Sequence, residues 1–286
     1  MRGTGPGAQA AAFRSGDTPA PLDGRRPRVV VWEADGSPYG GRRYGDAIMA
    51  RLAVAGVAAT TVPLTRRRPS AEELAAPVHV LSGGVTPATS GRHWVRSARR
   101  HLEPVLVRAL AGEATVTGIC FGAQLIAATL AGPGAVGPNP RGMEAGLAVV
   151  RPPPSGTSAA PDVRDAAGSV VSEFHHHLVD PAAVAALGGE VVLSNDHTEV
   201  QAFTVGPTIV GLQFHPELDP AATRATVRAH HHLIRAHGAA PGAALGSIDR
   251  LGGGWRAEIF DRLVVQPALP PASPPAQGLD EVSPAA

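Results

Sequence analysis

The sequence predicts an α/β fold: a mostly parallel open sheet flanked by helices, with an added antiparallel strand region in the C-terminal third. Two observations support this prediction. Up to residue 132, apolar runs typical of buried strands alternate with helical patterns, which implies crossover connections and parallel pairing. Beyond residue 144, short strand patterns follow one another with turns or loops between them, which favours antiparallel pairing.

In the N-terminal part, each strand pattern is a short β-branched or apolar run and each helical pattern ends at glycine. Gly56 and Gly112 are two of these ends, and Pro104 predicts a local defect in the longer helix. The expected strands are 28–32, 59–64, 78–84 and 116–119, and the expected helices are 45–56, 94–112 and 121–132.

The C-terminal third contains several short strand candidates. They are 144–151, 170–174, 190–196, 200–205 and 208–214. One helix is expected over 219–238, because Asp219 suits an N-cap and Gly238 suits the position after a helix end. A short terminal helix is expected over 256–265.

The two ends differ in composition from the rest of the 286 residues. Residues 1–26 have almost no large apolar side chains, so they are expected to form a disordered arm. Residues 27–265 are expected to form one domain, and 266–286 a mobile Pro/Ala-rich tail. Neither end is expected to contribute to the chemistry.

Composition limits the partners and the compartment. A formal net charge of +1 provides no general field for nucleic acid, and no apolar stretch approaches the roughly 20 residues that span a bilayer. The single cysteine cannot form an internal disulfide, and the first 20 residues lack a signal-peptide pattern. A cytoplasmic protein without nucleic-acid or membrane partners is therefore expected.

The single cysteine, Cys120, lies between a strand and a helix in the pattern G-x-C-x-G. Gly118 and Gly122 remove the Cβ atoms that would clash in a sharp strand-to-helix turn, the nucleophile elbow. Such a turn is expected to expose the thiol at the carboxyl edge of the sheet, where the following helix N-terminus stabilises a thiolate. The alternative is a buried structural cysteine.

A second motif, FHPE, supplies a candidate base. Pro216 disfavours helix at His215 and keeps it extended, so His215 and Glu217 share one face. The carboxylate can then orient and charge-stabilise the imidazole, as a base serving a nucleophile requires. The alternative is an exposed turn with incidental polar residues.

Together these motifs resemble those of class I (triad) glutamine amidotransferases, including the amidotransferase domain of GMP synthetase and the related γ-glutamyl hydrolases. The family pattern G-x-C-x-G-x-Q is matched over 118–124, and F-H-P-E over 214–217. Weaker matches are LSGG at 81–84, Glu-x-Gly at Glu144 and Gly146, and SEFHHHLVD at 172–180. The resemblance covers residues 28–237 and implies the flavodoxin-like fold of this family.

The resemblance also implies roles for residues. Cys120 would attack the side-chain amide of glutamine and form a γ-glutamyl thioester, while His215 transfers protons and Glu217 orients it. The backbone N–H groups of Gly84 and Phe121 would form the oxyanion hole. Gly83, Gln124 and His177 would bind the substrate. No cofactor and no metal are expected, and a separate synthase subunit would receive the ammonia.

Two departures from the family pattern leave the catalytic groups intact: Ala123 replaces a common histidine, and Val85 a common proline. The run at 175–177 resembles a segment of γ-glutamyl hydrolases, so a stand-alone hydrolase of γ-glutamyl conjugates remains an alternative. A non-catalytic binding module is another. The runs at 175–177 and 230–232 are not expected to bind metal, because no acidic or cysteine partner at ligand spacing was identified. A solvated helix face is expected for 230–232.

Overall fold

The structure, a computed structural model, describes residues 28–153 and 161–268. The predicted arm at 1–26 lies outside the described residues, as does the predicted tail from residue 269 onward. Residues 266–268 of that tail form a short 3-10 turn, η4 (Gln266–Ala268).

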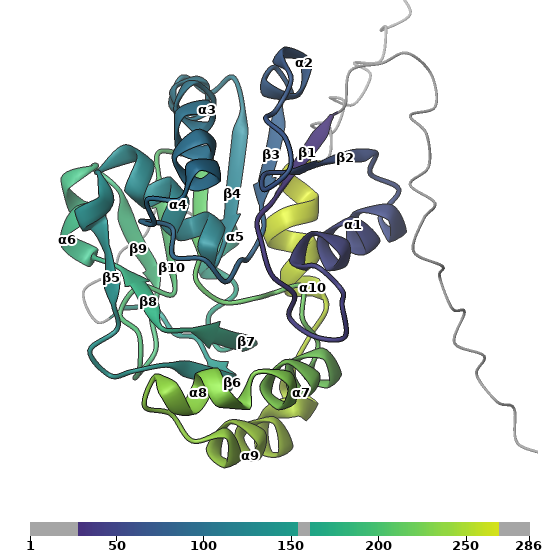
Figure 1. Cartoon of the computed structure of the whole chain (residues 1–286), viewed down its shortest axis with the longest axis vertical. Coiled ribbons are helices and arrows are strands. Elements are labelled where there is room, and N and C mark those ends of the chain that lie inside the picture. Colours follow the sequence, from purple (N-terminus) through teal and green to yellow (C-terminus); the bar gives the residue numbers. More distant parts are fainter. Residues whose placement is uncertain (1–27, 154–160, 269–286) are drawn as a thin grey trace, which may run out of the picture.

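Seven strands of the described chain form the central sheet, in the order β2-β1-β3-β4-β11-β10-β9 (Figure 1). The first five in this order pair in parallel, and β10 and β9 pair antiparallel at one edge. The strands are β1 (Val29–Glu33), β2 (Ala59–Pro63), β3 (Val78–Leu81), β4 (Thr115–Ile119), β9 (Glu190–Leu193), β10 (Ala202–Val205) and β11 (Ile209–Leu212). The predicted fold class is confirmed.

Strand β11 has a different pairing from the one expected. Its sequence predicted antiparallel pairing, and β11 does pair antiparallel with β10. On its other edge, however, β11 pairs in parallel with β4. Ile209 and Leu212 are fully buried, as a central strand covered on both faces requires. This pairing places the segment after β11 next to the segment after β4.

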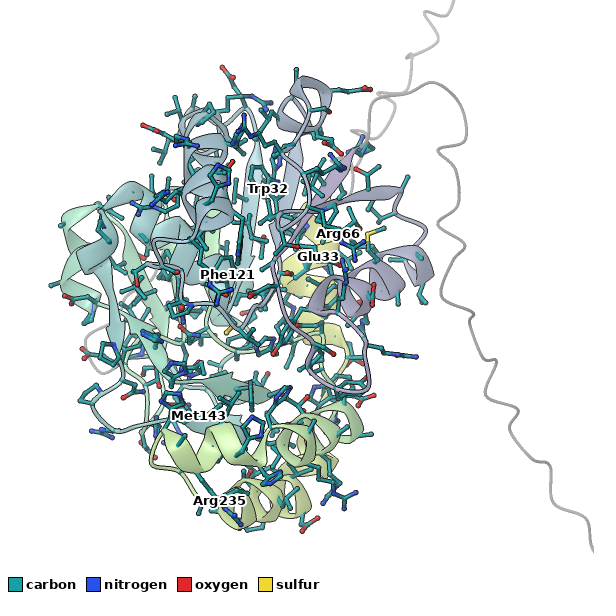
Figure 2. The ribbon with its side chains drawn as sticks, viewed as in Figure 1. Trp32, Glu33, Arg66, Phe121, Met143 and Arg235 are labelled. Atoms are coloured by element: carbon teal, nitrogen blue, oxygen red, sulfur yellow. The ribbon has the colours of Figure 1, made fainter. Side chains whose placement is uncertain are left out.

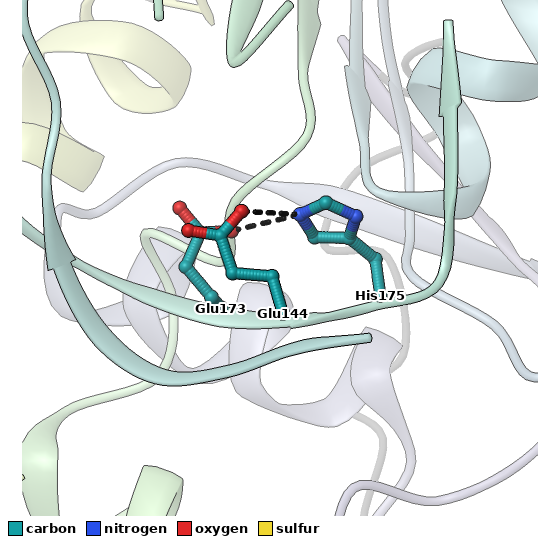
Figure 3. Close-up of side chains that lie close together, drawn as sticks. All are labelled: Glu144, Glu173 and His175. Carbon is teal, nitrogen blue, oxygen red and sulfur yellow. Dashed lines mark ion pairs between the residues drawn. The ribbon is translucent and has the colours of Figure 1, made fainter. Parts of the chain in front are cut away.

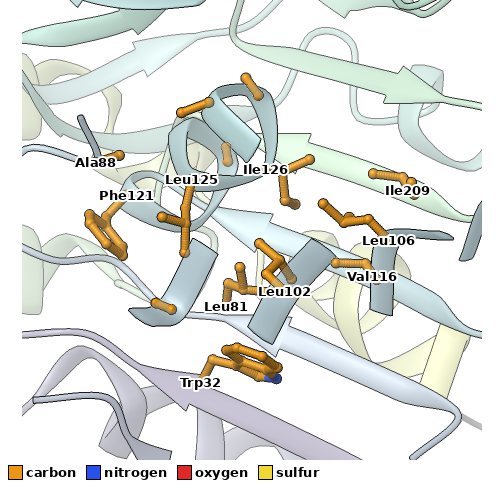
Figure 4. Close-up of a cluster of buried hydrophobic side chains, with 14 of the residues drawn as sticks. Trp32, Leu81, Ala88, Leu102, Leu106, Val116, Phe121, Leu125, Ile126 and Ile209 are labelled. Atoms are coloured by element: carbon orange, nitrogen blue, oxygen red, sulfur yellow. The ribbon is translucent and has the colours of Figure 1, made fainter. Parts of the chain in front are cut away.

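Helices cover both faces of the sheet. One face carries α3 (His93–Leu110) and α4 (Phe121–Leu130), whose apolar sides pack on the sheet around Trp32, Leu102 and Ile126 (Figure 4). Pro104 lies on the exposed side of α3, where water can satisfy the freed carbonyl, and the helix continues through it. The predicted local defect therefore does not interrupt the helix.

The other face carries helices from both ends of the described chain. The helix α1 (Tyr44–Val54) packs there beside the C-terminal α10 (Glu258–Phe260) and the π-helical turn η3 (Asp261–Val265). Ile48, Leu52 and Phe260 are fully buried in this layer. The predicted terminal helix is present, because its apolar residues complete the second face.

A separate antiparallel ribbon lies beyond the end of the sheet. It consists of β6 (Glu144–Val149) and β7 (Val170–His175), which pair with Glu144 opposite His175. Three helices cover the ribbon on its outer side (Figure 1): α7 (Pro220–Ala229), α8 (His231–Ala236) and α9 (Pro241–Leu251). The antiparallel region was predicted, but not its separation from the sheet.

The helix expected over 219–238 is two helices. Asp219 caps α7 by accepting a hydrogen bond from the Ala222 N–H, as predicted, but the chain leaves helical geometry at His230 (φ −114°, ψ 24°). At this break the imidazole contacts the Ser37 carbonyl at 2.9 Å and lies 5.4 Å from the Phe174 ring. The helix α9 was not predicted from the sequence. The remaining elements are α2 (Ala71–Leu74), β5 (Val136–Pro138), η1 (Pro133–Ala135), α5 (Pro161–Arg164), β8 (His177–Val179), α6 (Pro181–Ala186) and η2 (Gly252–Gly254).

Candidate active site

Cys120 forms the turn between β4 and α4. Its backbone (φ 48°, ψ −102°) is the one positive-φ conformation among the described non-glycine residues. A Cβ on Gly118 would lie 2.5 Å from the Gly122 carbonyl carbon, and one on Gly122 would lie 2.5 Å from the Leu81 oxygen. The two glycines therefore permit a strained turn that side chains would exclude, and such strain is typical of functional sites.

The thiol itself is buried, with 5% of Cys120 exposed, so the prediction of an exposed thiol was wrong. The reason is the separate ribbon, because Sγ lies 3.9 Å from the Phe174 carbonyl oxygen of β7. The sulfur remains at the N-terminal end of α4, as predicted. Cys120 also lines a pocket, so the site is covered but reachable.

His215 and Glu217 form the predicted pair. Nδ1 of His215 lies 2.8 Å from Oε1 of Glu217, and both side chains are fully buried. The His215 backbone N–H donates to the Ser172 carbonyl of β7 at 2.8 Å, and the Tyr44 ring stacks on the imidazole with centroids 5.1 Å apart. Within the described residues, Nε2 of His215 has no well-aligned hydrogen-bond partner. Glu217 thus holds Nδ1 of the ring, while Nε2 remains available.

Electrostatics connect the thiol to the imidazole. Burial alone would lower the pKa of His215, but the neighbouring Glu217 carboxyl group and Cys120 sulfur raise it to about 10. Near neutral pH the ring is therefore an imidazolium, flanked by a carboxylate and a sulfur. A positive charge beside the sulfur is the setting typical of cysteine nucleophiles.

The loop after β3 brings backbone close to both groups. A Cβ on Gly83 would lie 2.6 Å from Cε1 of His215, and one on Gly84 would lie 3.2 Å from the Phe121 ring. The Gly84 N–H has no backbone acceptor in the described part of the chain, and Phe121 begins α4, where the N–H groups lack intrahelical partners. Two free donors therefore lie in the region where an oxyanion hole is expected.

Asp35 holds this loop, and the sequence analysis did not identify it. Its Oδ1 accepts from the backbone N–H groups of Val85 at 3.2 Å and Thr86 at 3.0 Å, and its other oxygen accepts from the Thr86 hydroxyl. Ser82 ties the same loop to the end of β1, because its hydroxyl accepts from the Ala34 N–H at 3.0 Å. No sequence motif indicated these contacts between residues about 50 positions apart.

A pocket of about 270 Å³ lies between the elbow and the ribbon. Figure 2 labels Met143, a lining residue directly before β6, and Phe121, the first residue of α4. Of the predicted substrate-binding residues, Gln124 and His177 line it. Gln124 also holds the wall, because its Nε2 donates to the His177 carbonyl at 3.2 Å and to Gln213 at 3.1 Å. The full lining is Gly84, Val85, Thr86, Pro87, Cys120, Gln124, Met143, Phe174, His175, His176, His177, Leu233 and His237.

Three buried polar side chains form a cluster on the ribbon: Glu144, Glu173 and His175 (Figure 3). Nε2 of His175 lies 3.2 Å from Oε2 of Glu173 and 3.3 Å from Oε2 of Glu144. The prediction that the 175–177 run has no acidic partner at ligand spacing was therefore wrong. The signal was present in the sequence, because Glu173 and His175 are two positions apart and share a strand face.

The cluster's donor atoms lie within 4.8 Å of one another, but Oε2 of Glu144 already accepts from Thr198 at 2.8 Å and Gln201 at 3.0 Å. These hydrogen bonds occupy the lone pairs that a metal ion would require, so the donor set fits a proton better.

The other histidines of the two runs have different environments. His176 stacks on His237 with ring centroids 3.8 Å apart, and burial with the neighbouring His177 and His237 lowers its pKa to about 4, which keeps the ring neutral. His231 and His232 are exposed, as predicted for a solvated helix face, whereas His230 is partly buried at the helix break.

Comparisons with known proteins give a consistent result. A family model described as glutamine amidotransferase class-I matches residues 41–232. A glutamine amidotransferase structure from Thermotoga maritima gives a TM-score of 0.64 at 18% identity, covering 85% of this chain and 99% of that chain. One from Methylobacillus flagellatus gives 0.56 at 17% identity, covering 85% and 95%. A search of curated proteins finds no match. No helix in the described residues combines the length and apolar character that crossing a membrane requires.

Proposed function

Because the chain belongs to the class-I glutamine amidotransferase family, we propose that it hydrolyses the side-chain amide of glutamine through Cys120, His215 and Glu217. The observation that carries this proposal is the strained Cys120 turn beside a buried imidazole that Glu217 holds at 2.8 Å. A nucleophile, a base and an orienting carboxylate are the groups that acyl transfer requires.

In the first half-reaction, the Cys120 thiolate attacks the amide carbon of glutamine. The carbonyl oxygen becomes an oxyanion, which the N–H groups of Gly84 and Phe121 would stabilise. The carbon–nitrogen bond then breaks as the His215 imidazolium gives its proton to the leaving nitrogen. The products are ammonia and a γ-glutamyl thioester on Cys120, with His215 left neutral.

In the second half-reaction, neutral His215 removes a proton from a water molecule, whose oxygen attacks the thioester carbon. The carbon–sulfur bond breaks, glutamate leaves, and the sulfur departs as thiolate beside the regenerated imidazolium. The Glu217 carboxylate stabilises the imidazolium in both steps and holds the ring so that Nε2 faces the reacting atoms. Tyr44 restricts the ring further by stacking on it.

The released ammonia requires an acceptor, because free ammonia is mostly protonated at neutral pH and no longer nucleophilic. The proposal therefore includes a separate synthase subunit that receives it. Glutamate release should be slow in the isolated chain and faster with such a partner. A rate that is high and unaffected by candidate synthases would contradict this part of the proposal.

A second candidate is the hydrolysis of γ-glutamyl conjugates, and the composition of the pocket favours it. Met143, Phe174 and Leu233 provide apolar surface near Cys120, and the neutral, stacked imidazole of His176 adds a flat face. A leaving amine with an apolar or planar group would suit these walls better than ammonia does.

The deciding experiment measures glutamate release from glutamine and from γ-glutamyl anilides under the same conditions. The proposal predicts higher kcat/KM for glutamine, and the second candidate predicts the reverse. A diazoketone analogue of glutamine should label the protein once, on Cys120, and the mass shift should disappear in Cys120→Ser. Labelling or turnover that persists in Cys120→Ser would exclude Cys120 as the nucleophile.

A further inference from the structure

The cluster of Glu144, Glu173 and His175 requires a positive charge. Nδ1 of His175 lies 3.0 Å from the His177 carbonyl oxygen, which only accepts hydrogen bonds, so Nδ1 carries a proton. A neutral ring would then direct the Nε2 lone pair at the Glu144 oxygen 3.3 Å away, and because Glu144 is ionised this contact would be repulsive. His175 is therefore an imidazolium, and its two carboxylate neighbours raise its pKa well above the usual value despite burial.

The two carboxylates have unequal surroundings. Glu144 accepts from Asn195 at 2.6 Å, Thr198 at 2.8 Å and Gln201 at 3.0 Å. These bonds, with His175, outweigh burial and hold its pKa below the usual value, so Glu144 is ionised.

Glu173 is fully buried, and within the described residues neither of its oxygens has a well-aligned hydrogen-bond donor. One imidazolium cannot neutralise two buried carboxylates, and the uncompensated charge would be costly. The carboxyl group without donors is the one expected to keep its proton. Burial and the neighbouring Glu144 raise the pKa of Glu173 to about 8, in agreement with this assignment.

We propose that Glu173 is a positioning residue that stays protonated at neutral pH and, with Glu144, clamps His175 so that the pocket wall facing Cys120 is fixed. This inference rests on the proposed function for its kinetic consequence. Its structural consequence, a proton held at Glu173 in the folded state, is independent of turnover.

The path from the cluster to the reacting groups runs along β7 and the turn after it. His175 and Gln124 both donate to the His177 carbonyl, and Gln124 lies one turn after Cys120 on α4. The Phe174 carbonyl faces the thiol at 3.9 Å. Displacement of His175 would therefore move the wall of the pocket without removing a group that touches substrate.

Ionisation of Glu173 would add a second negative charge to this wall. The titratable groups around the cluster are Glu144 on β6, His175 on β7, His197 before β10 and His215 after β11. His176 follows β7, and His177 begins β8. His215 lies within electrostatic reach of Glu173, so the added charge would also act on the catalytic imidazole. Above the pKa of Glu173, the wall should loosen and substrate binding should weaken.

The kinetic test compares the wild type with Glu173→Gln between pH 6.5 and 9.5. The glutamine side chain introduced at position 173 has nearly the shape of a protonated glutamate side chain, and it cannot ionise. The wild-type KM should rise about tenfold above pH 8, more than kcat changes, whereas the variant's KM should stay level. Glu144→Gln is the matched control, because it removes the ionised carboxylate and should raise KM at every pH. Parallel KM profiles for the wild type and Glu173→Gln would overturn the proposal.

A second measurement does not depend on turnover. The folded protein keeps a proton on Glu173 that the unfolded chain loses, so this group's stabilising contribution is lost as pH rises towards 8. The wild-type Tm should fall relative to that of Glu173→Gln between pH 5 and 9. If the Tm values of the wild type and Glu173→Gln have the same pH dependence, Glu173 does not keep a proton in the folded state. This result would overturn the proposal even if glutaminase activity is absent. One tightly bound metal ion per chain, lost in Glu173→Gln, would also overturn it.

Discussion

The backbone N–H of Cys120 donates to the Leu212 carbonyl at 2.7 Å, which places the proposed nucleophile beside the last residue of β11, three positions before His215. The bond extends the parallel register in which Leu212 lies opposite Ile119. Two motifs about 95 positions apart in the sequence therefore meet at one edge of the sheet. The alignment of sulfur and imidazole depends on this register, which a one-residue slip would destroy.

The strained backbone of Cys120 leads to a prediction about stability. Glycine tolerates positive φ and alanine does not, so Cys120→Gly should exceed Cys120→Ala in free energy of unfolding by about 1–2 kcal/mol. Both variants lack the thiol, and both should be inactive. Urea denaturation of the two variants measures the difference. Equal stabilities would show that the turn is not strained.

Gly122 should not tolerate a side chain. Its Cβ would lie 2.5 Å from the Leu81 oxygen, and backbone cannot move aside as a flexible side chain can. We expect Gly122→Ala to cost about 1–3 kcal/mol or to prevent folding. Gly134→Ala is the matched control, because nothing lies within 4 Å of its Cβ position. Thermal unfolding should separate the two, and similar Tm values would contradict the tight approach of β3 to the elbow.

The charge of Glu217 should set the titration of His215. The pKa of this imidazole is about 10 in the wild type because Glu217 and Cys120 outweigh the effect of burial. In Glu217→Gln one of these charges is lost, so the ring should deprotonate at lower pH while the hydrogen bond partly orients it. Histidine ¹⁵N NMR across pH 6–11 measures this. His215→Asn identifies the resonance, and an unchanged midpoint would contradict the role of Glu217.

The Tyr44 ring should matter through stacking rather than through its hydroxyl. Burial, with the charges of Cys120 and Glu217, raises the pKa of Tyr44 well above its usual value, so the hydroxyl stays protonated. Tyr44→Phe keeps the stacked ring and should retain kcat within about threefold, whereas Tyr44→Leu should lose about tenfold by freeing the imidazole. A larger loss in Tyr44→Phe would instead assign a role to the hydroxyl.

The sequence predicted the fold class and the three side chains that meet at the candidate site, because both depend on local patterns. Strand and helix periods identified most elements of the sheet, and Gly118, Gly122 and Pro216 indicated the local backbone at the two motifs. It did not predict that β6 and β7 leave the sheet, because a strand pattern specifies which face is apolar and not which edge it pairs with. The burial of the thiol was not predicted for the same reason, because the ribbon of β6 and β7 covers Cys120.

The contacts that hold the site were harder to predict. Asp35 supports a loop about 50 residues away, and no property of either segment indicates the pairing. Part of the cluster at His175 could have been predicted, because Glu173 is two residues earlier on the same strand. Its second carboxylate, Glu144, comes from another strand. Long-range polar partners of this kind depend on the tertiary fold rather than on local periodicity.

The ribbon of β6 and β7 gives the candidate active site a second support, which the His215–Ser172 backbone hydrogen bond joins to the central sheet. The elbow and the FHPE segment are attached to the central sheet, whereas the opposite wall belongs to a ribbon with its own small core beneath α7 and α9. Substitutions in that small core should therefore change the cavity wall more than the spacing of sulfur and imidazole. Grafting this ribbon and its helices between members of the family is therefore a rational route to altered selectivity.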